Sequence, residues 1–115
     1  MTERRRFPRE ARLRRSDEIR GVMRRGRRTA RGPLQAFVAP AGAERARVAV
    51  VVPRHGRTAV QRNRLKRRLR EILRLRWLPG APPRDVVLRA GPRAYGRSFA
   101  ELERSVLRCL SDTDS

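Results

Sequence analysis

The amino-acid sequence predicts an α+β fold, a small sandwich of three helices on a mixed sheet. Segments with helical apolar spacing alternate with short β-branched runs, in the order helix, strand, strand, helix, strand, helix. The 115 residues suffice for one hydrophobic core, and no linker divides them. We therefore expect a single domain over residues 1–115, with a basic N-terminal arm at 1–12 and a frayed polar tail at 111–115.

The first helix is predicted over residues 16–25. Ser16 can serve as its N-cap, and two acids follow in the first turn. Gly26 can take the left-handed conformation that often ends a helix. A narrow apolar face is supplied by Leu13, Ile19, Val22 and Met23.

Two strands are predicted next, at 34–38 and 47–52. The strand at 47–52 is nearly all apolar and β-branched, so we expect it to be central in the sheet and buried on both faces. The short connection around Pro40 and Gly42 favours antiparallel pairing of these two strands.

The longest helix is predicted to begin after Thr58 and to run to about Trp77. Thr58 and Gln61 have the capping-box spacing, and Pro79 with Gly80 stops the helix. One apolar stripe is formed by Leu65, Leu69, Ile72 and Leu73.

A third strand is predicted at 85–90 and a last helix at 99–110. Ser98 and Glu101 form a second capping box before this helix. A strand, helix and strand in succession require a β-α-β crossover, so we expect strand 85–90 to lie parallel to strand 47–52. The helices would then cover the sheet and turn their charged faces outward.

Charge is the dominant property of the chain. Lys and Arg number 31 against 11 Asp and Glu, giving a formal net charge of +20 and a pI near 12.0. Self-repulsion of this size favours a polyanionic partner. Nucleic acid fits better than a membrane, because no long apolar segment accompanies the charge. The basic N-terminus has no apolar run after it, so we expect a cytoplasmic protein.

The sequence contains few candidate catalytic residues. His55 is the only histidine and falls in a loop, where an ordinary surface role is more common than that of a general base. Cys109 falls on the core side of the last helix and is expected to be a small buried apolar residue. The acids are scattered, and no spacing indicates a metal site. We therefore expect no catalytic residue, no metal and no small-molecule substrate.

The helix around residues 62–74 carries the strongest signal. The only acid in this stretch is Glu71. Seven residues are basic, at positions 62, 64, 66, 67, 68, 70 and 74. A solvated helix face is the usual meaning of a charge run, but so many like charges on one helix repel each other. Asn63 near the helix N-terminus adds a group suited to a phosphate or a base edge. The pattern predicts binding of RNA or DNA.

The hexapeptide at 62–67, Arg-Asn-Arg-Leu-Lys-Arg, resembles the signature helix of the bacterial ribonuclease P protein family. Neighbouring features occur in the family's order: the Phe-Pro-Arg-Glu-Ala-Arg-Leu run at 7–13, Gly26 after the first helix, the strand at 47–52, the basic turn at 54–57, and Asp-Val-Val at 85–87. The resemblance covers roughly residues 7 to 110.

This resemblance implies a fold similar to domain 2 of ribosomal protein S5 and a catalytic RNA as the partner. The family's complex removes the 5′ leader of precursor tRNA, and the RNA with its Mg²⁺ ions carries the chemistry. The resemblance places contacts to the catalytic RNA at Arg62, Asn63, Arg64, Lys66, Arg67, Arg68 and Arg70. It places contacts to the leader at Phe7, Ile19, Met23, Phe37 and Arg54.

The chain departs from the family pattern at two places. Positions 19 and 23 are often aromatic in the family but are Ile19 and Met23 here, so base stacking would be weaker. Plain core packing is the alternative role for both residues. The turn at 56–59 reads Gly-Arg-Thr-Ala, where the family often has Gly-Asn-Ala.

Three alternative functions remain open at this point. A ribosomal or chaperone RNA-binding protein would share the charge and the fold. A stand-alone nuclease would have to use His55 and scattered acids. A DNA-compacting protein would bind duplex DNA and structured RNA equally well.

Overall fold

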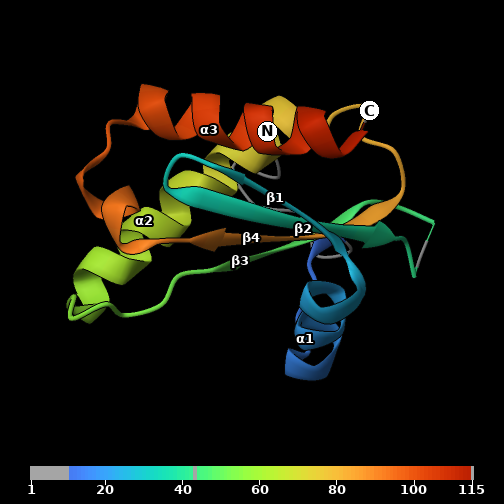
Figure 1. Ribbon diagram of the computed structural model, residues 1–115, viewed down its shortest axis with the longest axis horizontal. Helices are drawn as coiled ribbons and strands as arrows, with labels where there is room; N and C mark the ends of the chain where they lie inside the picture. The colour runs from blue at the N-terminus through green and yellow to red at the C-terminus, as the bar shows by residue number, and fades with distance from the viewer. Residues whose placement is uncertain (1–10, 43, 115) are drawn as a thin grey trace, which may run out of the picture.

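The computed structural model describes residues 11–42 and 44–114, with side chains described as far as Ser111. Its elements are α1 (Ser16–Arg25), β1 (Arg27–Arg31), β2 (Leu34–Pro40), β3 (Arg47–Val51), α2 (Ala59–Ile72), the π-helical turn η3 (Leu73–Trp77), β4 (Arg84–Ala90), the 3-10 turn η4 (Pro92–Gly96) and α3 (Phe99–Asp114). Figure 1 shows three layers, with α2 and α3 on one face of the sheet and α1 on the other. The predicted class, three helices on a mixed sheet, is confirmed.

The strand order of the sheet differs from the sequence-based expectation. In the described residues the order is β1-β2-β4-β3, with β1 and β4 antiparallel to β2 and with β3 parallel to β4. The parallel β3-α2-β4 crossover is therefore confirmed. The predicted antiparallel pair of β2 and β3 is wrong, because β4 lies between them.

Strand β3 is an edge strand and not a central one, although Val48, Ala49 and Val50 are buried as predicted. Its outer edge is covered by the chain before α1. The Leu13 amide donates to the Val48 carbonyl at 2.9 Å, and Arg12 forms a parallel bridge with Val48. This contact helps to bury β3 although the strand is at the edge of the sheet.

The segment at 1–12 is only partly an arm. Residues 1–10 lie outside the described residues. Ala11 is buried in the larger core cluster, and Arg12 pairs with β3. The packed domain therefore begins no later than Ala11, which corrects the predicted boundary.

Strand β1 was not predicted from the sequence. Its five residues, Arg-Arg-Thr-Ala-Arg, show no apolar alternation, and only Thr29 is half-buried. It forms by pairing with β2 through a turn in which Gly32 has a φ of 57°, a left-handed value that favours glycine. The result is an exposed edge strand rich in arginine.

Helix α1 has the predicted bounds, but its ends differ from the prediction. The N-cap is Arg15, and its side chain makes no capping bond, so Ser16 is the first helical residue and not the cap. Gly26 is extended (φ −76°, ψ 155°) and not left-handed. Glycine is needed there for another reason: a Cβ would lie 2.5 Å from the Val22 carbonyl oxygen and 3.1 Å from the Val38 nitrogen.

Helices α2 and α3 begin at the predicted capping boxes. The Gln61 amide donates to Thr58 Oγ1 at 3.2 Å, and the Thr58 amide donates to Gln61 Oε1 at 3.0 Å. Ser98 and Glu101 make the same pair of bonds. Helix α3 continues to Asp114, beyond the end predicted at 110, and residue 115 of the predicted tail lies outside the described residues. No Gly or Pro follows residue 99 to stop this helix.

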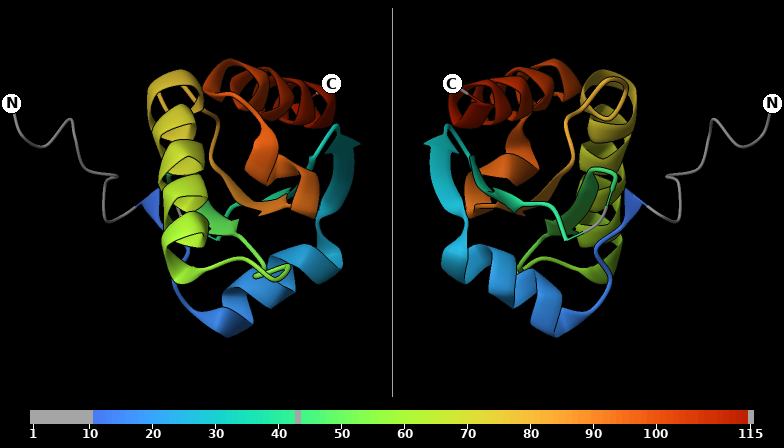
Figure 2. Two further views of the ribbon diagram at one scale, coloured as in Figure 1. Left: turned by 90° about the vertical axis from the view of Figure 1, so that its left-hand side faces the viewer. Right: turned by 90° about the vertical axis from the view of Figure 1, so that its right-hand side faces the viewer.

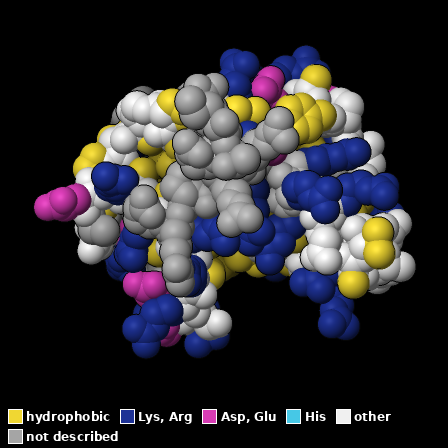
Figure 3. Space-filling view, turned by 180° about the vertical axis from the view of Figure 1, so that it is seen from behind, with side chains coloured by type: hydrophobic (Ala, Val, Ile, Leu, Met, Phe, Trp, Pro, Cys, Tyr) yellow, Lys and Arg dark blue, Asp and Glu magenta, His cyan; other side chains and the backbone are white. Residues whose placement is uncertain are grey.

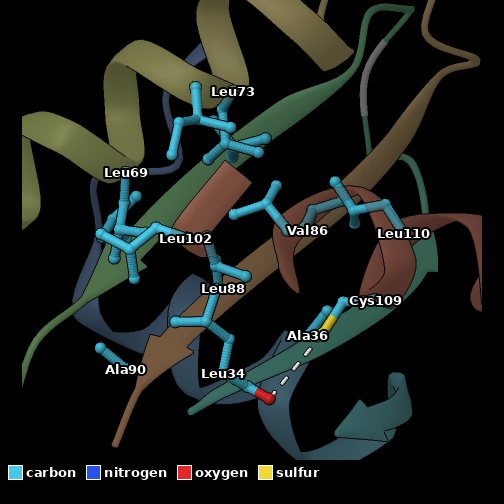
Figure 4. Close-up of a cluster of buried hydrophobic side chains, with 14 of the residues drawn as sticks. Leu34, Ala36, Leu69, Leu73, Val86, Leu88, Ala90, Leu102, Cys109 and Leu110 are labelled. Atoms are coloured by element: carbon cyan, nitrogen blue, oxygen red, sulfur yellow. Dashed lines mark hydrogen bonds between the residues drawn. The ribbon is translucent and has the colours of Figure 1, made fainter. Parts of the chain in front are cut away.

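The core consists of two clusters, one on each face of the sheet. The larger lies under α2 and α3, where Leu69, Leu88 and Leu102 are fully buried (Figure 4). Cys109 belongs to it as predicted, with its Sγ 3.8 Å from the Leu34 carbonyl oxygen. The smaller cluster, under α1, consists of Leu13, Val22, Phe37, Ala39, Ala49 and Val87, against which Ile19, Met23 and Val51 pack.

A buried ion pair fixes α1 over the sheet. Asp85 is 1% exposed and accepts from Arg47 Nε at 3.0 Å and Nη2 at 2.9 Å. The Gly42 amide donates to the same carboxylate at 3.2 Å. Arg47 Nη1 also reaches Glu18 of α1 at 3.4 Å. One carboxylate thus joins β3, β4, the loop after β2 and, through Arg47, α1.

Candidate nucleic-acid interface

The outward face of α2 is a cationic surface whose one acid among the described residues, Glu71, is paired with Arg74. Arg64, Arg67 and Arg68 are exposed, as is Asn63 beside them. Figure 3 shows Lys and Arg side chains gathered over this part of the molecule. Among the described residues, no carboxylate lies within ion-pairing distance of these three arginines. Their positions follow from the buried stripe of Leu65, Leu69 and Ile72, which turns the opposite face of the helix to solvent.

The single acid of α2, Glu71, lies on this same face, three and four positions after Arg68 and Arg67, but it is already paired. Glu71 accepts from Arg74 Nη2 at 2.8 Å and from Nε at 3.2 Å. Arg74 is therefore paired within the helix. The other cations of the run have no ion pair among the described residues.

Arg62, Lys66 and Arg70 are half-buried and differ from their exposed neighbours. Arg62 Nε donates to the Val52 carbonyl at 3.2 Å, which ties the first turn of α2 to the end of β3. This bond uses one donor of the guanidinium and orients the rest of the group. Arg62 thus has a structural bond that the sequence did not reveal.

Lys66 and Arg70 line a cavity of about 300 Å³ between α2, β3 and the segment before α1. Arg12, Arg14 and Ile19 also line this cavity. No acid is among the described lining residues. The sequence analysis missed Arg12 and Arg14 because they are some fifty positions from α2 in the chain, and only the pairing with β3 brings them there.

Like charges crowd this cavity. Burial lowers the pKa of Lys66, and repulsion from Arg70 and Arg62 lowers it further. Burial also lowers the pKa of Arg70, with repulsion from Arg12 as the second cause. An anion in the cavity would relieve both effects. The cavity therefore suits a phosphate group.

The residues expected at a leader site fall into the smaller core cluster. Ile19 and Met23 are half-buried, and Phe37 is only 8% exposed. Most of the Phe37 ring is thus used in packing, which leaves little surface for a base. Phe7 lies outside the described residues.

Arg54 is exposed in the loop between β3 and α2. Tyr95 holds this loop: its hydroxyl donates to the Pro53 carbonyl at 2.9 Å, and Arg57 stacks over its ring at 4.8 Å. The Arg57 amide donates to the Arg54 carbonyl at 2.7 Å, which closes the turn. The loop is a defined structure that presents Arg54 to solvent.

A second cavity, of about 380 Å³, lies where this loop meets the turn between β1 and β2. Gln35, Arg89, Arg93 and His55 are among its lining residues. Gln35 is two residues from Phe37 on the same strand and so faces the same side of the sheet. Arg89 is the register partner of Gln35. The sequence analysis did not identify Arg89 or Arg93, because neither belongs to a run of basic residues.

The described residues offer little for protein-based catalysis. No group of three or more His, Cys, Asp or Glu side chains in residues 11–42 and 44–111 is placed to hold a metal ion. Cys109 is buried, and His55 is an exposed loop residue with a φ of 47°. Among the same residues, no helix is both long and apolar enough to cross a membrane.

Comparisons with known proteins agree with this geometry. The family model described as Ribonuclease P matches residues 7–114. The ribonuclease P protein component of Acidothermus cellulolyticus is 38% identical over 106 residues, which cover 90% of this chain and 88% of that protein. The corresponding protein of Nocardioides sp. is 42% identical over 104 residues, covering 86% and 87% of the two chains.

Solved structures show the same fold. The RNase P protein of Staphylococcus aureus superposes with a TM-score of 0.80 at 18% identity, over 88% of this chain and 93% of that one. The RNase P protein of Thermotoga maritima gives a TM-score of 0.77 at 23% identity, over 88% and 96%. At such identities these likenesses bear on the fold alone.

Proposed function

Because the chain belongs to the ribonuclease P protein family, we propose that α2 binds the catalytic RNA while the sheet face beside α1 binds the 5′ leader of precursor tRNA. Membership makes the chain a protein component of ribonuclease P, the endoribonuclease that processes the 5′ end of tRNA. The observation that carries the proposal is the cationic face of α2, whose Arg64, Arg67 and Arg68 have no ion pair among the described residues, next to the cavity of Lys66 and Arg70.

The contribution of α2 would be electrostatic. Asn63, Arg64, Arg67 and Arg68 would contact phosphates at the exposed face, and Lys66 and Arg70 would contact a phosphate in the cavity, with Arg62 oriented by its bond to Val52. Neutralised phosphates release counterions, so the affinity should fall linearly with the logarithm of the salt concentration. The protein would screen the repulsion between two polyanions, the catalytic RNA and its substrate.

The leader would lie along the exposed part of the sheet and enter the cavity at Gln35. The phosphates of the leader would be bound by the arginines that line or border this path, Arg54, Arg89 and Arg93. Ile19 and Met23 would offer apolar contacts to a base in place of aromatic stacking. Because Phe37 is mostly buried, its effect on leader binding would come largely through the position of α1.

The chemistry would come from the RNA. The catalytic RNA would hold the Mg²⁺ ions that supply the hydrolytic chemistry, and the protein would supply affinity for substrate. Its partners would be ribonuclease P RNA and precursor tRNA, with no membrane and no small-molecule substrate, and its location the cytoplasm.

The test is cleavage of a precursor tRNA by a bacterial ribonuclease P RNA at low Mg²⁺. We expect cleavage at the mature 5′ end only when RNA and protein are combined. Arg64→Gln/Arg67→Gln should lose this effect. The matched control, Arg104→Gln/Arg108→Gln on the outward face of α3, removes the same charge and should retain it.

Two results would contradict the proposal. Cleavage by the protein alone, abolished by His55→Ala, would indicate a stand-alone nuclease. Tight RNA binding without any gain in cleavage, using the RNA of the same organism, would indicate a ribosomal-type binding protein.

A further inference from the structure

A second cationic surface lies at the edge of the sheet opposite α2. It consists of the last turn of α1 and strand β1, and we call it the β1 edge surface. Its members are Arg24, Arg25, Arg27, Arg28 and Arg31, all exposed. Five cations in eight positions make it as dense in charge as α2.

The two surfaces are separated by the whole sheet. Strand β1 is at one end of the order β1-β2-β4-β3, and α2 packs at the other end beside β3. The intervening strand spacings amount to about 14 Å, and the molecule is 36 Å in its longest dimension. Figure 2 shows α2 and β1 on opposite sides of the molecule. An RNA backbone that lies along α2 is therefore not positioned to contact the β1 edge surface as well.

Four of the five arginines of the β1 edge surface have no ion pair among the described residues. Among the described residues, no carboxylate pairs with Arg24, Arg25, Arg27 or Arg28. Arg27 and Arg28 point to opposite faces of the sheet, because side chains alternate along a strand. Positive charge is therefore present on both faces of the sheet at strand β1, and the last turn of α1 adds two more arginines.

The chemistry of this surface points to a phosphate backbone. Residues 24–32 contain no aromatic residue, so they offer no platform on which an unstacked base could stack. Ala30 is the only apolar side chain in that stretch, which is too little to anchor a protein at a membrane surface. Exposed guanidinium groups alone suit the backbone of duplex RNA, which is read by shape and charge.

We propose that the β1 edge surface binds the phosphate backbone of a second RNA duplex, so that one protein molecule bridges two RNA segments. The segment on α2 and the segment on β1 would approach from opposite edges of the sheet. This role is additional to leader binding, and its test requires no cleavage.

The test is a bridging assay with two short RNA duplexes of arbitrary sequence. One duplex is immobilised, the other carries a fluorophore, and protein is added at about 150 mM KCl, where the Debye length is about 8 Å. Wild-type protein should retain the fluorescent duplex. Arg24→Gln/Arg25→Gln/Arg27→Gln/Arg28→Gln should bind the immobilised duplex through α2 yet retain about tenfold less of the fluorescent one.

A charge-preserving variant is the matched control. Arg24→Lys/Arg25→Lys/Arg27→Lys/Arg28→Lys keeps every cation and should bridge like wild type. The α2 variant Arg64→Gln/Arg67→Gln should also lose bridging, because two surfaces are required. Circular dichroism checks folding, and the pair Arg27→Gln/Arg28→Gln repeats the test with α1 intact.

One alternative role for these arginines would overturn the proposal. Basic side chains on an edge strand also prevent pairing between sheets of different molecules. If the four-Gln variant bridges as well as wild type and self-associates in light scattering, the arginines serve only that protective role.

Discussion

Lys66 is the only lysine of the chain, and it lies half-buried among arginines. Because burial and the neighbouring arginines lower its pKa, the unfolded chain binds this proton more tightly than the folded one. The free energy of unfolding should therefore rise with pH as the folded protein loses the Lys66 proton, up to the ordinary lysine pKa. In NMR spectra of ¹³C-lysine-labelled protein, we expect the single lysine side-chain signal to titrate at a lower pH in the folded protein than in the denatured chain.

Binding of RNA should reverse this effect. A phosphate in the cavity of Lys66 and Arg70 favours the charged amine, so saturating RNA should raise the pKa of Lys66. Lys66→Arg removes the signal and confirms its assignment. An unchanged titration in the complex would place the RNA elsewhere than this cavity.

Asp85 holds the Arg47 side chain that reaches Glu18 of α1. Asp85→Asn leaves Arg47 without its main partner, and breaking a buried pair costs about 3 kcal/mol. We expect urea denaturation to show a loss of this size in the free energy of unfolding. Glu44→Asn, at an exposed acid outside any ion pair among the described residues, is the control and should change little. Equal effects of the two substitutions would mean that the Arg47–Asp85 pair contributes nothing net.

At the scale of elements, the junction between α1 and β1 depends on Gly26. Gly26→Ala would bring a Cβ within 2.5 Å of the Val22 carbonyl oxygen, so the helix end must shift at a cost of about 2 kcal/mol. Gly96→Ala is the matched control, since its Cβ would meet nothing within 4 Å. Thermal unfolding should give a lower melting temperature for Gly26→Ala than for Gly96→Ala. A wild-type melting temperature for Gly26→Ala would refute the close approach of the Val22 carbonyl to position 26.

Elements with local signals were predictable from sequence. The capping boxes at Thr58 and Ser98 and the stripe of Leu65 and Leu69 depend on residues within one or two turns, so α2 and α3 begin where expected. Strand order was not predictable, because the insertion of β4 beside β2 depends on contacts between distant segments. Strand β1 gave no signal, since pairing with β2 and not its own composition makes it a strand.

The residues of the candidate site also differ in whether the sequence alone could predict them. The cations of α2 form one contiguous run and were predicted. Arg12, Arg14, Arg89 and Arg93 come from other elements, and only the fold brings them to the two cavities. Phe37 was predicted as a leader contact, but its burial under α1 is a property of the packed sheet that no sequence pattern reveals.

On the scale of the whole molecule, the net charge of +20 opposes folding and favours RNA binding. Most cations of α2, among them Arg64, Arg67 and Arg68, have no ion pair among the described residues. In the described residues, no ion pair involves Arg64, Arg67 or Arg68 on α2, or Arg24, Arg25, Arg27 or Arg28 at the β1 edge. Repulsion within each surface is therefore present in the folded protein and decreases when RNA binds.

Salt should affect stability and RNA affinity in opposite directions. Raising KCl from about 0.1 M to about 1 M shortens the Debye length from about 10 Å to about 3 Å. Screening of self-repulsion should then raise the free energy of unfolding measured in urea, while RNA affinity falls. Arg64→Gln/Arg67→Gln/Arg68→Gln should weaken both dependences, because it removes charge from the same surface. If stability instead fell with KCl, ion pairs such as Arg47 with Asp85 would outweigh the repulsion, and the excess charge would not limit folding.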